Sequence, residues 1–223
     1  MTRQPPEGRR AVIVGNGPSA DALPPAALAE AQENGWLLIG TNRVLVFEAL
    51  LWTPWDAIII HDTHADLWKD PEVGHLYHEL HWKRSEAWRV GPAAQRTTEC
   101  DEYVRFSIYW RAESEWDSDD ERACLGGQSP VLAANWAFLQ GVREVALIGC
   151  EYSGGGLARM VPPFGGQPTA GPRYDGTPPE ACIEKQFERA LLGFRAGGGR
   201  MVNCSPGTLL ESVPFEPWDE VVR

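Results

Sequence analysis

The chain has 223 residues, of which 43% are hydrophobic and 23% are charged, a composition typical of a globular protein with a substantial core. No stretch approaches the ~20 consecutive apolar residues that a membrane-spanning helix needs. The formal net charge of −11 disfavours binding along the bare phosphate backbone of a nucleic acid, although it leaves room for a local pocket that holds a nucleotide.

The cysteines indicate a cellular compartment. Five cysteines are scattered along the chain, and no two of them form a C-x-x-C pair. This usage favours free thiols in a reducing cytoplasm over a disulfide framework or a structural zinc site, so we expect a cytoplasmic protein. The ten tryptophans are expected mainly in the core or at interfaces. The pair in "LLWTPW" is a candidate subunit interface, so a homo-oligomer is one possible state.

Short apolar runs alternate with helical patterns along the first half of the chain. The strands predicted there cover residues 10–14, 36–42, 56–62, 87–91 and 102–110. The helices predicted there cover residues 23–35 and 43–51, and residues 65–84 are expected to be partly helical. The acidic stretch 111–123, "RAESEWDSDDERA", is predicted to be a surface loop.

The second half continues the alternation. A helix is predicted from Ser129 as N-cap, with Pro130 at its first position and Gly141 as its stop. A buried strand (144–151), a long amphipathic helix (179–198) and a final strand and turn (199–212) follow. Strand–helix alternation predicts a single Rossmann-like α/β domain over residues 1–223, with a mostly parallel sheet and helices on both faces. The Gly/Pro-rich residues 153–178 are predicted to form a lid loop.

The stretch "AVIVGNGPSA" joins the first strand to a tight glycine loop. Gly15, Gly17 and Ala20 have the G-x-G-x-x-G/A spacing of a dinucleotide site, in which glycines let backbone N–H groups approach a phosphate. Pro18 removes one N–H donor, and the second strand ends in "GTN" without an acidic residue, so NAD is disfavoured. A close strand-to-helix turn that holds no ligand is the structural alternative.

Four segments resemble those of a bacterial sialyltransferase family. "VIVGNGPSA" is similar to the family's opening, and similar G-P-S openings occur in the archaeal-type 6-hydroxymethylpterin diphosphokinase-like proteins. "GTN", "GQSPVLAANWAFLQGVREVALIGCEYSG" and "MVNCSPGTLLES" follow in the same order as similar family segments. The resemblance implies a nucleotide-sugar donor of the CMP-sugar type, bound at the carboxyl ends of the strands. The implied contacts are Gly15, Asn16, Gly17, Pro18, Ser19, Asn42, Ser129 and Glu151.

The resemblance also implies where the donor phosphate and the catalytic base would lie. Arg159 and Arg173 of the lid are candidate phosphate partners. No histidine follows His81, so the family's lid histidine has no counterpart, and Asp175 lies near its expected place. His61, Asp62 and His64 follow a buried strand and are expected at the active edge of the sheet. One of these four residues is expected to be the base, although ligation of a divalent metal or capping of the strand end stays open for the "HDTH" residues.

Three functions remain open from the sequence. The leading hypothesis is a glycosyltransferase-like transferase whose acceptor is unknown and is a glycan, a pterin or a modified base. The second is a pyrophosphokinase or other phosphoryl transferase, which would hold Mg²⁺ on carboxylates around Asp62 or Asp117. The third is a non-catalytic nucleotide-binding protein. No other metal or cofactor is implied.

Overall fold

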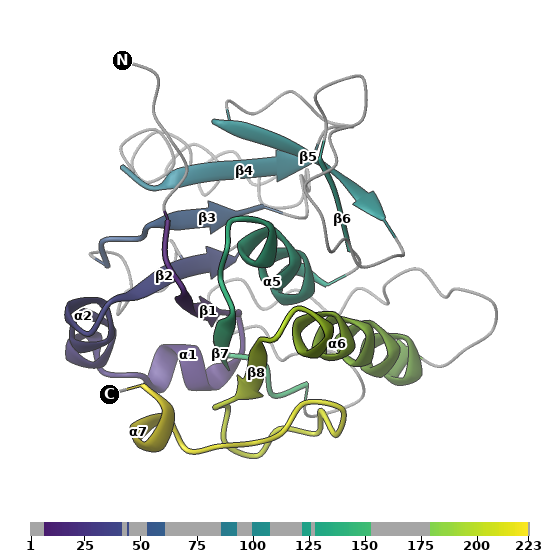
Figure 1. Ribbon diagram of the computed structural model, residues 1–223. Coiled ribbons are helices and arrows are strands. Elements are labelled where there is room, and N and C mark those ends of the chain that lie inside the picture. Colours follow the sequence, from purple (N-terminus) through teal and green to yellow (C-terminus); the bar gives the residue numbers. More distant parts are fainter. Residues whose placement is uncertain are drawn as a thin grey trace, which may run out of the picture.

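The computed structural model describes residues 7–41, 44, 53–60, 86–92, 100–107, 122–125, 128–152 and 179–222. Within these residues the chain alternates between strands and helices (Figure 1). The strands are β1 (Arg10–Val14), β2 (Trp36–Thr41), β3 (Ala57–Ile59), β4 (Trp88–Pro92), β5 (Glu102–Ser107), β6 (Arg122–Leu125), β7 (Glu144–Ile148) and β8 (Arg200–Asn203). The helices are α1 (Pro18–Ala22), α2 (Pro25–Glu33), α5 (Ser129–Leu139), α6 (Pro179–Ala196) and α7 (Trp218–Val221).

The described strands form one eight-stranded sheet in the order β6-β5-β4-β3-β2-β1-β7-β8. Every neighbouring pair is parallel. The central strand β1 pairs with β2 on one side and with β7 on the other. Strands β2 to β6 therefore extend the sheet in one direction, and β7 and β8 extend it in the other, so the strand order reverses between β1 and β7.

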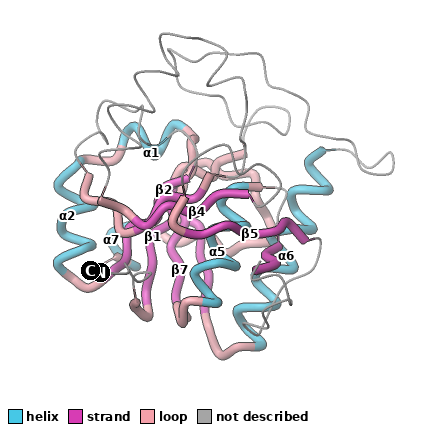
Figure 2. Tube along the Cα trace, turned by 90° about the horizontal axis from the view of Figure 1, so that it is seen from above, coloured by secondary structure: helices cyan, strands magenta, loops and turns pink. Residues whose placement is uncertain are grey.

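Helices cover both faces of the sheet, as the view from above shows (Figure 2). Alternate residues of β1 explain why: Ala11 and Ile13 pack with α5 and α6, whereas Val12 and Val14 pack with α1 and α2. Strands that are apolar on both faces are expected in a parallel sheet, because crossover helices bury both faces. The prediction of a Rossmann-like α/β fold with helices on both faces is confirmed.

Helix α5 packs on the sheet and on α6, which itself contacts β8, and α5 is buried from Ser129 to Phe138. Its partner α6 contributes Phe187 and Phe194 to the same core, and Phe194 meets Phe138 edge to face with ring centroids 5.2 Å apart. One detail of the prediction is wrong. Gln128 is the N-cap and Ser129 is the first helical residue, because Gln128 is the last residue with extended backbone.

The predicted strands that begin at residues 10, 36, 56, 87, 102, 144 and 199 each coincide with an observed strand, although β4 ends one residue beyond its predicted range, and both predicted glycine stops are present. Gly35 and Gly141 follow α2 and α5 with φ of +82° and +100°, which glycine adopts without a steric cost. The described structure adds three elements that the sequence did not predict: β6, α1 and α7. The predicted helix at 43–51 and the predicted lid at 153–178 lie outside the described ranges, apart from Val44.

The segment after β8 returns along the outer side of that strand. Asn203 forms a parallel bridge with Phe215; its N–H donates to the carbonyl of Pro214, and its own carbonyl accepts from Glu216 N. The carboxyl end of β8 is therefore covered at this edge of the sheet by the chain's own backbone. Among the described helices, none is long and apolar enough to cross a membrane.

Candidate functional site

The site begins where the strand order reverses. Val14 and Ile148 are register partners at the carboxyl ends of β1 and β7. The loops that follow, residues 15–19 and 149–152, consequently start side by side. In open parallel α/β sheets, ligands bind in the crevice outside the carboxyl ends of the strands at such a switch point.

The two loops touch through their backbones. Gly15 N donates to Ile148 O over 2.7 Å, and Gly17 N donates to Gly149 O over 2.9 Å. A Cβ on Gly15 would lie 2.4 Å from Gly149 O, and a Cβ on Gly149 would lie 2.8 Å from Gly15 O. Glycine is therefore required at both positions by a close approach of two backbones.

Glu151 reaches from the second loop into the first. Its Oε1 accepts a hydrogen bond from Ser19 N at 2.6 Å, while Ser19 Oγ accepts one from Gly149 N at 2.9 Å. A Cβ on Gly17 would lie 1.8 Å from Glu151 Oε2, so the missing side chain of Gly17 makes the space for this carboxylate. Glu151 is 5% exposed, and its Oε2 has no hydrogen-bond partner among the residues that the structure describes.

These contacts change what the glycine loop offers to a ligand. The N–H groups of Gly15, Gly17 and Ser19 all donate to acceptors of the protein itself. The negative group that accepts from the start of α1 is the carboxylate of Glu151. The assignment of residues 15–19 to a nucleotide stays a prediction, and the structure limits it to contacts that do not use these three N–H groups.

A polar cluster after β8 holds the second loop from its other side. Cys150 N donates to Ser205 Oγ over 2.8 Å, and Leu209 N donates to Glu151 O over 2.8 Å. Cys150 O accepts from both Asn203 Nδ2 and Thr208 Oγ1, each at 3.1 Å. The segment "NCSPGT" therefore fixes the backbone that carries Glu151. Sequence reasoning identified this segment only as a similar closing motif and assigned no role to Asn203, Ser205 or Thr208.

Tyr152 completes the second loop with φ of +51°, the left-handed region that a tyrosine rarely adopts. Its ring packs edge to face on Phe187 of α6 at a centroid distance of 5.5 Å. Burial, and then the neighbouring Cys150 and Glu151, raise the pKa of the phenol, so Tyr152 is neutral at physiological pH. Strained backbone of this kind persists only where the surrounding contacts impose it.

Ser129 lies at the same edge of the sheet as the first residue of α5, and it is 7% exposed. No side chain of the N-cap residue caps this helix, and its first turn contains no acidic residue. The start of α5 thus differs from the start of α1, where the Glu151 carboxylate is bound. At β2, Thr41 Oγ1 donates to Val14 O at 2.9 Å and joins the ends of β1 and β2.

Several predicted site residues lie outside the described ranges, so their placement stays untested. These are Asn42, His61, Asp62, His64, Arg159, Arg173 and Asp175. Among the described residues, no group of three or more histidine, cysteine, aspartate or glutamate side chains is arranged to hold a metal ion.

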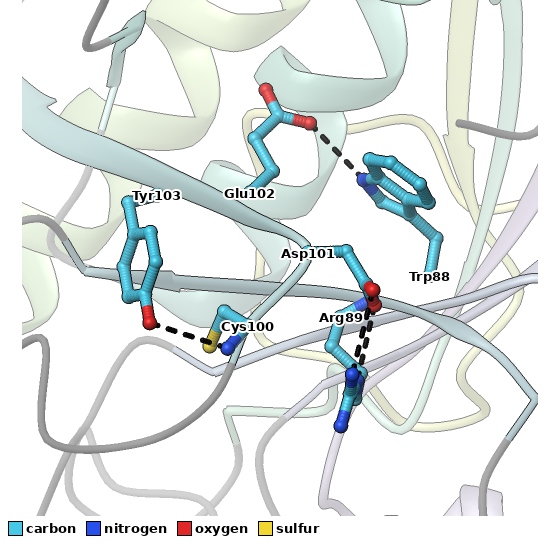
Figure 3. Close-up of polar contacts among 6 residues, drawn as sticks. All are labelled: Trp88, Arg89, Cys100, Asp101, Glu102 and Tyr103. Atoms are coloured by element: carbon cyan, nitrogen blue, oxygen red, sulfur yellow. Dashed lines mark hydrogen bonds and ion pairs between the residues drawn. The ribbon is translucent and has the colours of Figure 1, made fainter. Parts of the chain in front are cut away.

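A second polar cluster lies at the amino ends of β4 and β5, on the opposite edge of the sheet (Figure 3). Arg89 pairs with Asp101 at 3.0 Å, and Glu102 Oε2 accepts from the indole N–H groups of Trp88 at 3.2 Å and Trp136 at 3.0 Å. Burial raises the pKa of the adjacent Cys100 thiol to about 12, so this cysteine is protonated at neutral pH. These contacts join strands to α5 and serve packing.

Comparison of the chain with known protein families, with curated proteins and with solved structures finds no match in any of the three.

Proposed function

We propose that this protein is a nucleotide-dependent transferase that binds a nucleotide-sugar donor, of the CMP-sugar type, at the carboxyl edge of the sheet between β1 and β7. One observation carries the proposal: the interlocked loops 15–19 and 149–152 stand at the switch point of an all-parallel sheet. The general behaviour of such sheets supports a ligand there. The resemblance of "VIVGNGPSA" and of the segment around Ser129 to sialyltransferases supports the class of donor.

The charges at this edge support one orientation of the nucleotide. The Glu151 carboxylate at the start of α1 would repel a phosphate, because like charges destabilise each other strongly in a buried site. The start of α5 has no acidic residue in its first turn, and the partial positive charge of a helix start favours an anion. We therefore place the donor phosphate near Ser129 and the nucleoside toward Glu151.

In the proposed reaction, the acceptor hydroxyl attacks the anomeric carbon of the donor and gives its proton to a base. The bond from that carbon to the phosphate oxygen breaks, and the nucleotide leaves with the electron pair. Negative charge grows on the leaving phosphate, so its stabilisation by the start of α5 and by Arg159 or Arg173 is expected to matter most. His61, Asp62, His64 or Asp175 would be the base.

Calorimetric titration with CMP and with a CMP-sugar tests the proposal. We expect the wild-type protein to bind, and Gly17→Ala to weaken binding at least roughly tenfold, because its Cβ would push the Glu151 carboxylate into the ligand's space. Gly8→Ala is the matched control, since its Cβ would meet only the flexible side chain of Leu37, at 2.9 Å. Circular dichroism shows whether each variant is folded.

A second variant keeps the test informative if Gly17→Ala does not fold. Ser129→Ala removes only a hydroxyl at the start of α5 and is expected to weaken CMP binding roughly 10-fold to 100-fold, the worth of one hydrogen bond to a charged group. Absence of nucleotide binding by the wild type, or unchanged affinity in both variants, would overturn the proposal. Turnover that stops on addition of a chelator would favour phosphoryl transfer instead, and binding without any donor hydrolysis or transfer would favour a non-catalytic protein.

A further inference from the structure

We infer that the Glu151 carboxylate recognises a ribose hydroxyl of the bound nucleotide and thereby selects ribonucleotides over nucleotides that lack these hydroxyls. The inference deepens the proposed function and rests on it. It starts from Oε2 of Glu151, a buried oxygen for which the described part of the chain supplies no hydrogen-bond donor.

Only one of the two carboxylate oxygens of Glu151 is used by the described structure. Oε1 accepts from Ser19 N at 2.6 Å, whereas Oε2 is buried without a hydrogen-bond partner. A buried acceptor without a donor is destabilising, and the penalty is larger for a charged group. If a bound ligand supplies the missing donor, this penalty is removed, and the removal contributes to the free energy of binding.

The N–H groups around Glu151 have acceptors elsewhere. Gly17 N donates to Gly149 O, Gly149 N to Ser19 Oγ, and Cys150 N to Ser205 Oγ. The neighbouring Leu209 N donates to the backbone carbonyl of Glu151. Each of these four N–H groups of the described loops therefore donates to another acceptor, and none of them donates to Oε2.

The chemistry of a carboxylate narrows the class of ligand group. An ionised carboxylate only accepts hydrogen bonds, so it matches a hydroxyl or an amine and disfavours a phosphate. A metal ion would need further oxygen or nitrogen ligands, and the described residues contain no cluster that supplies them. A ribose offers two adjacent hydroxyl donors, and a carboxylate at a strand end is the group that binds ribose hydroxyls in dinucleotide-binding sheets.

The position of the side chain fits this role. Gly17 leaves the space that Oε2 occupies, and the cluster after β8 holds the backbone of residues 150–151 from the other side. The terminal torsion of a glutamate is soft, so a small rotation turns Oε2 toward a hydroxyl without moving the backbone. Glu151 would then hold Ser19 N with one oxygen and the ribose with the other.

Calorimetric titration with the four ribonucleoside monophosphates and their 2′,3′-dideoxy counterparts tests the inference. For the wild type we expect the dideoxy form of the preferred nucleotide to bind roughly 10-fold to 100-fold more weakly, the worth of a hydrogen bond to a charged acceptor. In Glu151→Gln, whose neutral amide keeps the shape of the side chain, this ratio is expected to fall to within a few-fold of one. Glu33→Gln, at an exposed position of α2, is the matched control and should keep the wild-type ratio.

The outcomes separate the inference from the proposed function. Equal binding of the ribose and dideoxy forms by the wild type would overturn the inference and leave the nucleotide site standing. An unchanged ratio in Glu151→Gln, or a preference that follows the base and ignores the sugar, would also overturn it. If none of the eight ligands binds the wild type, the proposed function fails and the inference fails with it.

Discussion

At the scale of single residues, the turn after β7 shows how one unfavourable conformation is held by several favourable contacts. Tyr152 has φ of +51°, yet its ring packs on Phe187 and the preceding residues are bonded on both sides. The left-handed region costs a residue with a Cβ roughly 1–2 kcal/mol. The surrounding contacts must therefore outweigh this cost.

This strain can be measured by comparing two substitutions that both remove the ring. We expect Tyr152→Gly to be more stable than Tyr152→Ala by about 0.5–1 kcal/mol, because only glycine adopts positive φ without a steric cost, while its extra freedom in the unfolded chain offsets part of the gain. Urea unfolding followed by circular dichroism gives the difference. An alanine variant at least as stable as the glycine variant would show that the backbone relaxes out of the left-handed region.

Residue-level prediction from the sequence succeeds where the cause is local. The spacing of Gly15 and Gly17 after an apolar run predicts a tight turn after the strand, which the structure has, but the group that approaches these glycines closely is the backbone of Gly149. The sequence does not show that the Glu151 carboxylate occupies the space beside Gly17, because the two residues are separated by 134 positions and meet only through the pairing of β1 with β7. The same holds for the hydrogen bond from Asn203 to Cys150 O, because Cys150 lies on the loop after another strand, β7.

At the scale of elements, the strand β8 and the turn after it act together as a support for the candidate site. Asn203 is fully buried, and its side chain donates to Cys150 O and Thr208 Oγ1 while its Oδ1 accepts from Ser205 N. A single amide side chain thus joins the end of β8, the turn and the loop after β7. This arrangement positions Glu151 without touching its carboxylate.

Removal of this amide is expected to destabilise the fold strongly. Asn203→Ala should lower the free energy of unfolding by roughly 2–4 kcal/mol, because it leaves buried backbone groups without partners. Asn34→Ala, at an exposed position after α2, is the control and should change stability by less than about 0.5 kcal/mol. Thermal or urea unfolding measures both. A small effect in Asn203→Ala would mean that water replaces the lost contacts.

The elements that the sequence did not predict are short. β6 has four residues at the end of an acidic stretch, and α1 and α7 have five and four residues, too few to show a helical period. The error at the start of α5 has a similar cause. Both Gln128 and Ser129 precede the apolar face, and serine is the commoner N-cap, but the extended backbone of Gln128 decides the boundary.

At the scale of the whole molecule, one sheet separates two apolar layers, each with a buried cysteine. Cys150 belongs to the layer with α5 and α6, and Cys204 belongs to the layer with α1 and α2. Burial raises the pKa of Cys204 to about 12 and raises the pKa of Cys150 as well. Both thiols are therefore protonated in the folded protein and unreactive toward alkylation.

The protection of the two buried thiols in the folded protein gives a test of whether both layers unfold together. At pH 8 we expect negligible iodoacetamide labelling of Cys150 and Cys204 in the folded protein. In rising urea we expect both to become labelled along one transition, because unfolding exposes the thiols and returns their pKa toward the ordinary value near 8.5. Mass spectrometry of the peptides that contain each cysteine follows them separately. Labelling of one thiol at a urea concentration that protects the other would show two independent units.

The overall architecture follows from the sequence more readily than the site does. Alternation of apolar strands and amphipathic helices suffices for an α/β fold, since few other arrangements bury both kinds of element. The location of the candidate site depends on the order of the strands in the sheet. The local sequence of β7 does not predict that this strand pairs with β1. The family resemblance predicts a site at the carboxyl edge of the sheet, and this stays a prediction, whereas the occupied N–H groups of the glycine loop emerge only from the three-dimensional contacts.

The returning segment along β8 also bears on how copies of this chain would associate. An open strand at the border of a sheet is a template on which another molecule can continue the hydrogen-bonded ladder. Here Pro214 and Pro217, which have no N–H to donate, stand on either side of Phe215 in the outermost stretch. Continuation of the sheet from that end of β8 into fibres or strand-exchanged pairs is consequently discouraged.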